Sequence, residues 1–132
     1  MKALLDTHVL LWWVNADGPL SRRQQELVEG ANPEAPLFVS DITLWEIATL
    51  SSLGRIRLQL PLREWLEQAT APPLVQRIAI TPAIAAEVAA LPDSFHRDPA
   101  DRILVATARV LGCSLVTKDR RIILSGLVPT TT

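Results

Sequence analysis

The residues best suited to chemistry in this sequence are five acids that stand near the ends of expected structural elements. They come from four separate segments of the chain: Asp6, Glu46, Asp98, Asp101 and Asp119. Carboxylates gathered in a small volume repel one another and raise each other's pKa values, so such a cluster needs a compensating cation. Because no paired His or Cys accompanies them, the oxygen-only set predicts a hard ion, Mg²⁺ or Mn²⁺. Such an ion suits hydrolysis of a phosphodiester, since it acidifies a bound water and stabilises charge on the phosphate oxygens.

Glu46 is the most informative single acid. It falls within a predicted helix over 41–54, where Ile42, Leu50 and Leu53 share its stripe. A glutamate in an apolar stripe is costly to bury without a partner. The position therefore indicates a functional carboxylate, a buried pair with an arginine, or an edge position from which the carboxylate reaches water.

The acids at 98 and 101 open a long apolar segment, HRDPADRILVATARVLGC, over 96–113. Asp98 and Pro99 have the features of a helix start, and Gly112 has those of a helix end. Taken alone, both acids fit a solvated cap and a charge that complements the helix dipole. Set beside the other three acids, Asp101 becomes the candidate metal-site residue and the cap is assigned to Asp98.

The elements that must position these acids alternate between short β runs and helical runs. β runs are expected at 2–5, 37–39, 77–80, 114–117 and, at an edge, 127–129; the other helices are expected at 7–14, 21–30, 62–70 and 81–91. This alternation predicts a parallel sheet with helices on both faces. Ligands of such sheets gather beyond the carboxyl ends of the strands. Asp6 and Asp119, which follow the first and fourth strands, are therefore expected at one rim.

Composition limits the class of protein. The chain is 48% hydrophobic and 20% charged, which is typical of a globular protein, and 132 residues without repeat or linker predict a single domain over 1–132. A net charge of −1 excludes the overall basic character of a non-specific nucleic-acid binder. Cys113 is the only cysteine, so no intrachain disulfide forms. The first apolar run, 9–14, is too short to span a bilayer, so we expect a soluble cytoplasmic protein without a membrane partner.

Four stretches of the chain resemble PIN-domain nucleases, and most closely the VapC-type ribonuclease toxins of prokaryotic toxin–antitoxin pairs. These stretches are LLDTHVLLWW, TLWEIATLSSLGRI, HRDPADRILVATA and LVTKD, and the resemblance runs from Met1 to about Pro129. It implies a three-layer α/β/α sandwich with an acidic metal site that cleaves RNA. It also implies a small, separately encoded antitoxin partner and, commonly, a homodimer.

The resemblance assigns roles to individual residues. It places Asp6, Glu46, Asp101 and Asp119 at the acidic core, Asp98 as an additional acid, and Thr7 and Thr117 where the family often has a hydroxyl near the site. Two positions depart from the family subset: Leu50 stands where a lysine is frequent, and Ala100 where an aromatic residue is frequent. These departures concern how RNA is held and remove no acid.

Basic residues and histidines flank the acids. Arg97, Arg102, Lys118 and Arg120, with Arg121 beside them, either contact RNA phosphates or serve as ordinary surface charges and partners of the neighbouring acids. His96 is expected in a solvated loop or, as the alternative, in contact with substrate, and His8 in a structural or supporting role. Either Ser40 or Asp41 is expected at the cap of the helix over 41–54.

Two other functions fit the same acids. A phosphohydrolase would use Asp6 as nucleophile, but that chemistry usually has a second acid two residues on, where His8 stands. A non-catalytic PIN-like module would bind RNA or a protein, but it has no need of a repulsive acidic cluster. The sequence therefore favours a metal-dependent endoribonuclease.

Overall fold

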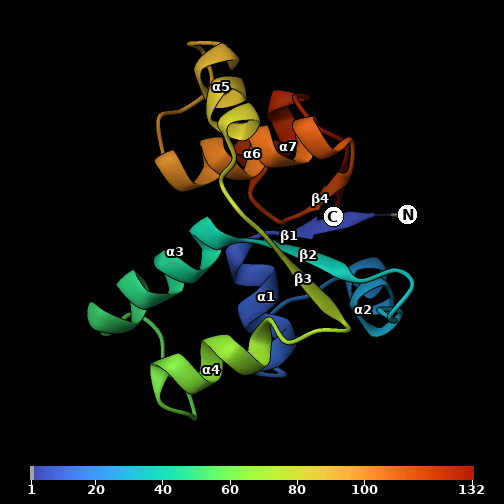
Figure 1. Cartoon of the computed structure of the whole chain (residues 1–132), viewed down its shortest axis with the longest axis vertical. Helices are drawn as coiled ribbons and strands as arrows, with labels where there is room; N and C mark the ends of the chain where they lie inside the picture. The colour runs from blue at the N-terminus through green and yellow to red at the C-terminus, as the bar shows by residue number, and fades with distance from the viewer. Residues whose placement is uncertain (1) are drawn as a thin grey trace.

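The centre of the fold is a five-stranded parallel sheet, seen in a computed structural model that describes residues 2–132 (Figure 1). The strands are β1 (Ala3–Leu5), β2 (Leu37–Ser40), β3 (Val75–Ile78), β4 (Ser114–Val116) and β5 (Thr130–Thr131). Their order is β3-β2-β1-β4-β5, and every neighbouring pair is parallel. The register places Leu4 of β1 between Phe38 of β2 and Leu115 of β4.

Helices cover both faces of this sheet. They are α1 (Thr7–Val14), α2 (Arg22–Glu29), α3 (Asp41–Ser52), α4 (Leu62–Ala69), α5 (Pro82–Ala90), α6 (Pro99–Leu111) and α7 (Arg120–Ser125). In Figure 1, α6 and α7 lie on one side of the strands with α5 beyond α6, and α1 and α4 lie on the other side. The predicted three-layer α/β/α sandwich with a parallel sheet is confirmed. Within residues 2–132, no helix has the length and apolar character needed to cross a membrane.

The two faces of the sheet bury separate hydrophobic clusters. Ala3 and Leu5 of β1 belong to the cluster formed with α1 and α4, whereas Leu4 belongs to the cluster formed with α6. Successive side chains of a strand point to opposite faces, so a central strand buries side chains on both faces when helices cover both of them. All three residues of β1 are accordingly buried.

Two strands lie away from their predicted positions. The third strand was expected at 77–80, but β3 runs from Val75 to Ile78, and Ile80 is 44% exposed. As an edge strand it buries only Val75 fully, so its apolar pattern is a weak guide to its register. The fifth strand was expected at 127–129, but Val128 instead fills the α6-side cluster and the pairing begins at Thr130.

One helix boundary also differs from the sequence expectation. The helix expected over 41–54 ends at Ser52, so Leu53 is a 59% exposed cap residue and does not share a buried stripe with Glu46. Its N-cap is Ser40, one of the two expected candidates, whose hydroxyl accepts a hydrogen bond from the backbone N–H of Ile42; Asp41, the other candidate, is the first residue of the helix. Ser40 is the N-cap because its backbone has the extended conformation that this position requires.

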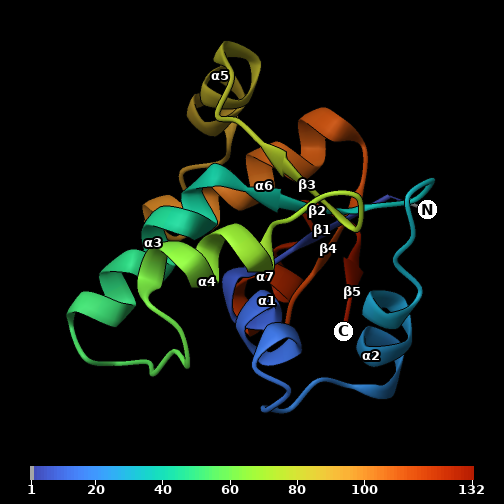
Figure 2. The same ribbon diagram turned by 60° about the horizontal axis from the view of Figure 1, so that its bottom comes forward.

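Helix α2 is largely polar but buries one polar side chain that links two parts of the fold. Its Gln24 is fully buried and donates hydrogen bonds to the backbone carbonyls of Thr117 and Thr131, each over 3.0 Å. Figure 2 shows α2 beside β5 and the C-terminus. Gln24 therefore fastens the chain that follows β4 to the edge strand β5, and that chain carries Asp119.

Candidate active site

The acids meet at the carboxyl edge of the sheet, between β1 and β4. The chain passes from β1 to β2 and β3 on one side, then to β4 and β5 on the other, so the strand order reverses between β1 and β4. Such a reversal leaves a crevice where α/β proteins bind ligands. A cavity of about 350 Å³ lies at this edge and is lined by Asp6, His8, Val9, Trp12, Glu46, Asp98, Asp101, Lys118, Asp119 and Arg121. We call it the acidic cavity, and all five candidate acids line it.

Asp6 is held from two sides. It is the N-cap of α1: its Oδ1 accepts a hydrogen bond from the backbone N–H of Thr7 at 2.6 Å, and its Oδ2 accepts one from the hydroxyl of Thr117 at 2.6 Å. Burial raises the pKa of Asp6, and these two hydrogen bonds oppose that rise. Since each carboxylate oxygen has two lone pairs, both remain able to accept a further ligand.

Glu46 reaches the same cavity from α3 through a pair of threonines. The hydroxyl of Thr7 donates to Oε1 of Glu46 at 2.5 Å and lies 3.1 Å from the hydroxyl of Thr43. Burial raises the pKa of Glu46, the Thr7 hydrogen bond lowers it, and the charges of Asp6 and Asp98 raise it further. No arginine of residues 2–132 forms an ion pair with Glu46, so the buried pair that the sequence also allowed is not what the structure shows.

Asp98 and Asp101 divide their roles at the start of α6. Oδ1 of Asp98 accepts hydrogen bonds from the backbone N–H groups of Ala100 and Asp101, at 3.0 and 3.4 Å, which confirms the predicted cap. The Asp101 side chain is only 10% exposed. Its burial, followed by the negative charges of the other four acids, raises the pKa of Asp101 to about 7. The carboxylates of the acidic cavity therefore repel one another.

Asp119 is the N-cap of α7, a helix that the sequence analysis did not predict. Its side chain accepts a hydrogen bond from the backbone N–H of Arg121 at 2.8 Å, and its own N–H donates to the Thr117 hydroxyl at 3.0 Å. No helix is expected over 120–125 from the sequence, but this segment forms α7. Its sequence signals were the acid cap and Gly126, which has a φ of 66° at the C-terminal cap, a backbone conformation that favours glycine.

Arg121 lines the acidic cavity, and His96 contacts Asp101 from beside it. Arg121 Nη2 lies 3.4 Å from Oδ2 of Asp119 and 3.6 Å from Oδ2 of Asp101, and these acids raise the pKa of the arginine. His96 Nε2 lies 3.2 Å from Oδ2 of Asp101, and its side chain is only 19% exposed. The expectation that His96 is solvated was wrong, because the loop before α6 folds back against the start of that helix.

The four predicted RNA-contact residues lie in different environments. Arg102 is buried and donates hydrogen bonds to the carbonyls of Phe95 and His96, so its assignment as an RNA contact was wrong. Lys118 is exposed and lines the acidic cavity. Arg97 is exposed and lies 3.5 Å from Asp93; Arg120 is also exposed but does not line the cavity.

The acidic cavity fits a divalent cation in charge and donor type. All five acids offer oxygen, and a cation would relieve the repulsion between them, which adds to burial in raising the pKa of Asp101. Between residues 2 and 132, no three His, Cys, Asp or Glu side chains already stand close enough to hold an ion together. Arg121 supplies part of the missing charge, and its 61% exposed side chain is free to turn outwards.

The parallel sheet, the reversal between β1 and β4, and the acids at that point define the PIN domain. The family model for the PIN domain matches residues 3–124, and the chain belongs to this family. It is 43% identical over 119 residues to Ribonuclease VapC22 of Mycobacterium tuberculosis (strain ATCC 25618 / H37Rv), a match that covers 90% of this chain and 88% of that protein.

Solved structures repeat the fold over nearly the whole chain. VapBC2 from Rickettsia felis, bound to a DNA fragment from its promoter, matches with a TM-score of 0.74 and 12% identity, covering 99% of this chain and 98% of that one. A toxin–antitoxin complex from Klebsiella pneumoniae matches with a TM-score of 0.68 and 21% identity, covering 98% and 96%. At these identities the structural matches establish the fold alone.

Proposed function

We propose that this chain is a divalent-metal-dependent endoribonuclease, acts as a single domain, and is the toxin of a toxin–antitoxin pair. The observation that carries the proposal is the convergence of five carboxylates on one cavity at the strand-order reversal of a PIN domain. The 43% identical relative is named a ribonuclease, which supports RNA as the substrate.

The residues of the acidic cavity have different proposed roles. In this proposal Asp6, Glu46, Asp101 and Asp119 hold Mg²⁺ or Mn²⁺, and Asp98 fixes the start of α6. The bound ion supplies an acidified water and stabilises charge on the phosphate. Thr7 and Thr117 orient the carboxylates of Glu46 and Asp6 through their hydroxyl hydrogen bonds.

Arg121 and Lys118 are the proposed phosphate contacts at this cavity. Arg121 faces Asp101 and Asp119 over 3.6 and 3.4 Å, distances that leave its guanidinium loosely held. When the charge of these acids is compensated, the guanidinium is released to pair with a phosphate, for which its forked donors are well suited. Arg97 and Arg120 lie on the surface and are proposed as weaker, salt-sensitive contacts.

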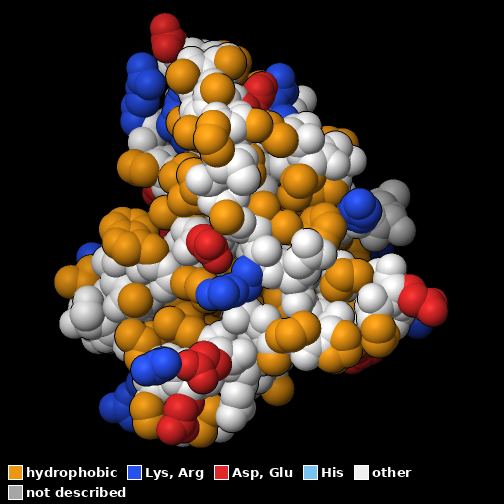
Figure 3. All heavy atoms as spheres, viewed as in Figure 1, with side chains coloured by type: hydrophobic (Ala, Val, Ile, Leu, Met, Phe, Trp, Pro, Cys, Tyr) orange, Lys and Arg blue, Asp and Glu red, His pale blue; other side chains and the backbone are white. Residues whose placement is uncertain are grey.

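A small antitoxin is the proposed protein partner, and the cytoplasm the proposed location. The similar chains come from VapBC2 of Rickettsia felis and from a toxin–antitoxin complex of Klebsiella pneumoniae. On this chain, Trp45 and Leu53 of the α3 region are 60% and 59% exposed, and Figure 3 shows apolar side chains along α3 and over α5. Contiguous apolar surface is typical of interaction sites, so the apolar side chains gathered along α3 in Figure 3 support a partner or a homodimer.

Incubation of the purified protein with single-stranded RNA tests the proposed activity. We expect internal cleavage with Mg²⁺ or Mn²⁺ and none with a chelator, because the acids alone cannot acidify a water. A parallel assay with a phosphate monoester tests the phosphohydrolase alternative. Monoester hydrolysis without RNA cleavage would favour Asp6 as a nucleophile, and RNA binding without any hydrolysis would favour the non-catalytic module.

A Thr117→Val substitution tests the support of Asp6. It removes the O–H that donates to Asp6 and the oxygen that accepts from the Asp119 N–H. We expect RNA cleavage to fall about 10- to 100-fold, the usual effect of losing a group that orients a metal ligand. Initial rates at saturating Mg²⁺ measure this effect.

The matched control is Thr107→Val. Thr107 is also buried, and its hydroxyl donates to the Ile103 carbonyl at 2.7 Å, away from the acids. Thr107→Val is expected to lose about 1 kcal/mol of stability from its one lost hydrogen bond, and Thr117→Val, which loses two, roughly 2 kcal/mol. Equal losses of cleavage in both variants would show that Thr117 acts through stability alone.

A further inference from the structure

A second cavity adjoins the acidic cavity and shares one lining residue, Arg121, with it. It has a volume of about 360 Å³ and lies between the loop that follows α5 and the α7 segment. Its lining includes Pro92, Ser94, Phe95, His96, Arg121 and Leu127. Arg121 also lines the acidic cavity, and His96 contacts Asp101 there. We call this second space the side cavity; its boundary with the acidic cavity is the pair His96 and Arg121.

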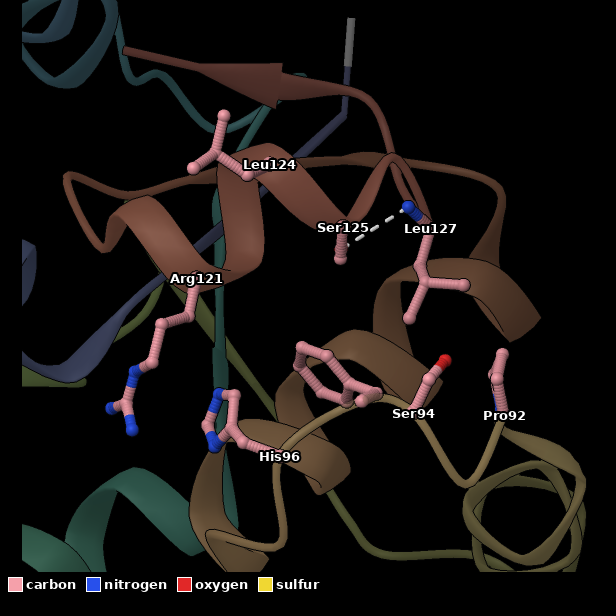
Figure 4. Close-up of a pocket in the computed structure, with 8 residues that line it drawn as sticks. Pro92, Ser94, His96, Arg121, Leu124, Ser125 and Leu127 are labelled. Carbon is pink, nitrogen blue, oxygen red and sulfur yellow. Dashed lines mark hydrogen bonds between the residues drawn. The ribbon is translucent and has the colours of Figure 1, made fainter.

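From this geometry we propose that the side cavity binds one unstacked nucleobase of the RNA, next to the phosphate held at the acidic cavity. The inference rests on the proposed nuclease function. A nucleotide whose phosphate lies at Arg121 must extend its base away from the acids. The side cavity opens on the other side of Arg121, as Figure 4 shows with Arg121 and His96 together at one end and Ser94 and Leu127 further in.

The lining of the side cavity matches the chemistry of a base. Leu127, Pro92 and the Phe95 ring offer apolar surface for the faces of a heterocycle, and Ser94 offers a hydroxyl to its edge. Figure 4 shows Leu127 pointing into the cavity and the Ser94 hydroxyl turned towards Leu127. Because a hydroxyl both donates and accepts, this arrangement accommodates each of the four bases. The volume falls in the range of about 300–1,000 Å³ that is typical of small-ligand sites.

The walls of the side cavity are already fixed. Arg102 donates to the carbonyls of Phe95 and His96 at 3.0 and 3.2 Å, and its guanidinium lies 5.9 Å from the centre of the Phe95 ring. On the opposite wall, the Ser125 hydroxyl donates to the Ile122 carbonyl and accepts from the Leu127 N–H. A site ordered before its ligand arrives loses little entropy on binding. The buried Arg102 thus serves RNA recognition indirectly, by holding the wall of the side cavity.

A comparison of nucleotides with a ligand that lacks the base tests the proposal. The Mg²⁺-loaded protein is titrated with each nucleoside 5′-monophosphate and with ribose 5-phosphate, and binding is followed by NMR chemical shifts. We expect the nucleotides to bind at least about five-fold more tightly than ribose 5-phosphate, the lower end of the effect of stacking one base. Equal affinities in the wild-type protein overturn the proposal.

Two variants test whether the base binds within the side cavity. Ser94→Leu fills it, and the preference for nucleotides over ribose 5-phosphate is expected to disappear; Leu127→Ala removes part of its wall and is expected to weaken that preference. Matched controls are Ser52→Leu, on the exposed end of α3, and Leu58→Ala, a half-buried leucine at the other cluster. Both controls should retain the wild-type preference, and melting curves report whether each variant folds.

The remaining outcomes separate this inference from its alternatives. A Ser94→Leu variant that keeps the wild-type preference overturns the proposal, because the base then binds elsewhere. If a variant keeps this preference but its mass in sedimentation changes, the side cavity is a contact between copies of the chain. This result also overturns the proposal. RNA cleavage with no base preference contradicts only the side cavity. Base preference without RNA cleavage contradicts only the proposed nuclease function.

Discussion

RNA cleavage by an Asp6→Asn variant is expected to be at least about 100-fold slower than cleavage by the wild-type protein. Asp6 is the acid most firmly held in place, with hydrogen bonds from the Thr7 N–H and the Thr117 hydroxyl directing its oxygens. Loss of a group that merely orients a metal ligand costs about 10- to 100-fold in activity or affinity, so loss of a ligand costs more. Initial rates with a single-stranded RNA and saturating Mg²⁺ measure this change.

The folded state of Asp6→Asn should survive the substitution. The asparagine oxygen can accept from the Thr7 N–H, and its amide can donate to the Thr117 oxygen if that hydroxyl rotates. This oxygen also accepts from the Asp119 N–H, and it has a lone pair for each donor. Loss of activity with a retained melting transition would therefore report on chemistry.

Asp93→Asn is the matched control for Asp6→Asn. It removes the same charge from an acid whose side chain is 96% exposed and does not line the acidic cavity. Its cleavage rate should stay within about two-fold of the wild-type rate, because exposed charges are largely screened by salt. If the two variants lose activity to the same extent, the nuclease activity depends on overall charge or comes from a contaminant.

The convergence of the acids could be predicted because it follows from topology. Asp6 and Asp119 come soon after the first and fourth strands, and parallel strands present their carboxyl ends at the same edge of a sheet. Glu46 could be predicted as a functional residue because a carboxylate in an apolar helix stripe is costly to bury without a partner. Its actual partner, Thr7, is 39 residues away, and only the folded structure reveals that pairing.

The errors concern side chains whose surroundings depend on loop paths. Arg102 and Arg97 look equivalent in sequence, yet one is buried under the loop before α6 and the other is exposed. The α6 periodicity does place position 102 on a helix, but its burial depends on three carbonyls at Val88, Phe95 and His96. Those carbonyls lie in α5 and the loop after it, and no local pattern fixes their path.

Edge strands and short helices were predicted least well for a related reason. Central strands such as β1 are buried on both faces and leave a continuous apolar run, whereas β3 is half exposed and β5 has two residues. A six-residue helix such as α7 has too few positions to establish a period. Its two caps were the available signal.

An Asp101→Asn variant is expected to melt at a higher temperature than the wild-type protein when metal is removed by a chelator at about pH 8. Burial and the four neighbouring acids raise the pKa of Asp101 from 3.8 to about 7, so its ionised form destabilises the folded state. The neutral amide avoids this cost. In a domain of this size, each kcal/mol corresponds to roughly 4 °C in Tm, so a rise of a few degrees is expected.

The pH dependence gives the sign of this effect. Between the ordinary value of 3.8 and about 7, the folded protein binds a proton at Asp101 that the unfolded chain has released, so stability falls as pH rises through this window. The difference in Tm between variant and wild type should therefore be small near pH 4, grow up to about pH 7 and then level off. Other groups titrate in both proteins and largely cancel in the difference.

Mg²⁺ should reverse the order of the two melting temperatures. An ion that binds only the folded state at 100 times its Kd stabilises it by about 2.7 kcal/mol, and this gain requires the Asp101 carboxylate. The wild-type protein should then exceed Asp101→Asn, which should gain little. If Asp101→Asn melts lower than the wild type in the chelator at pH 8, the contacts of Asp101 with His96 and Arg121 outweigh the repulsion. If Mg²⁺ raises both proteins equally, Asp101 is not a ligand, and the ion binds elsewhere.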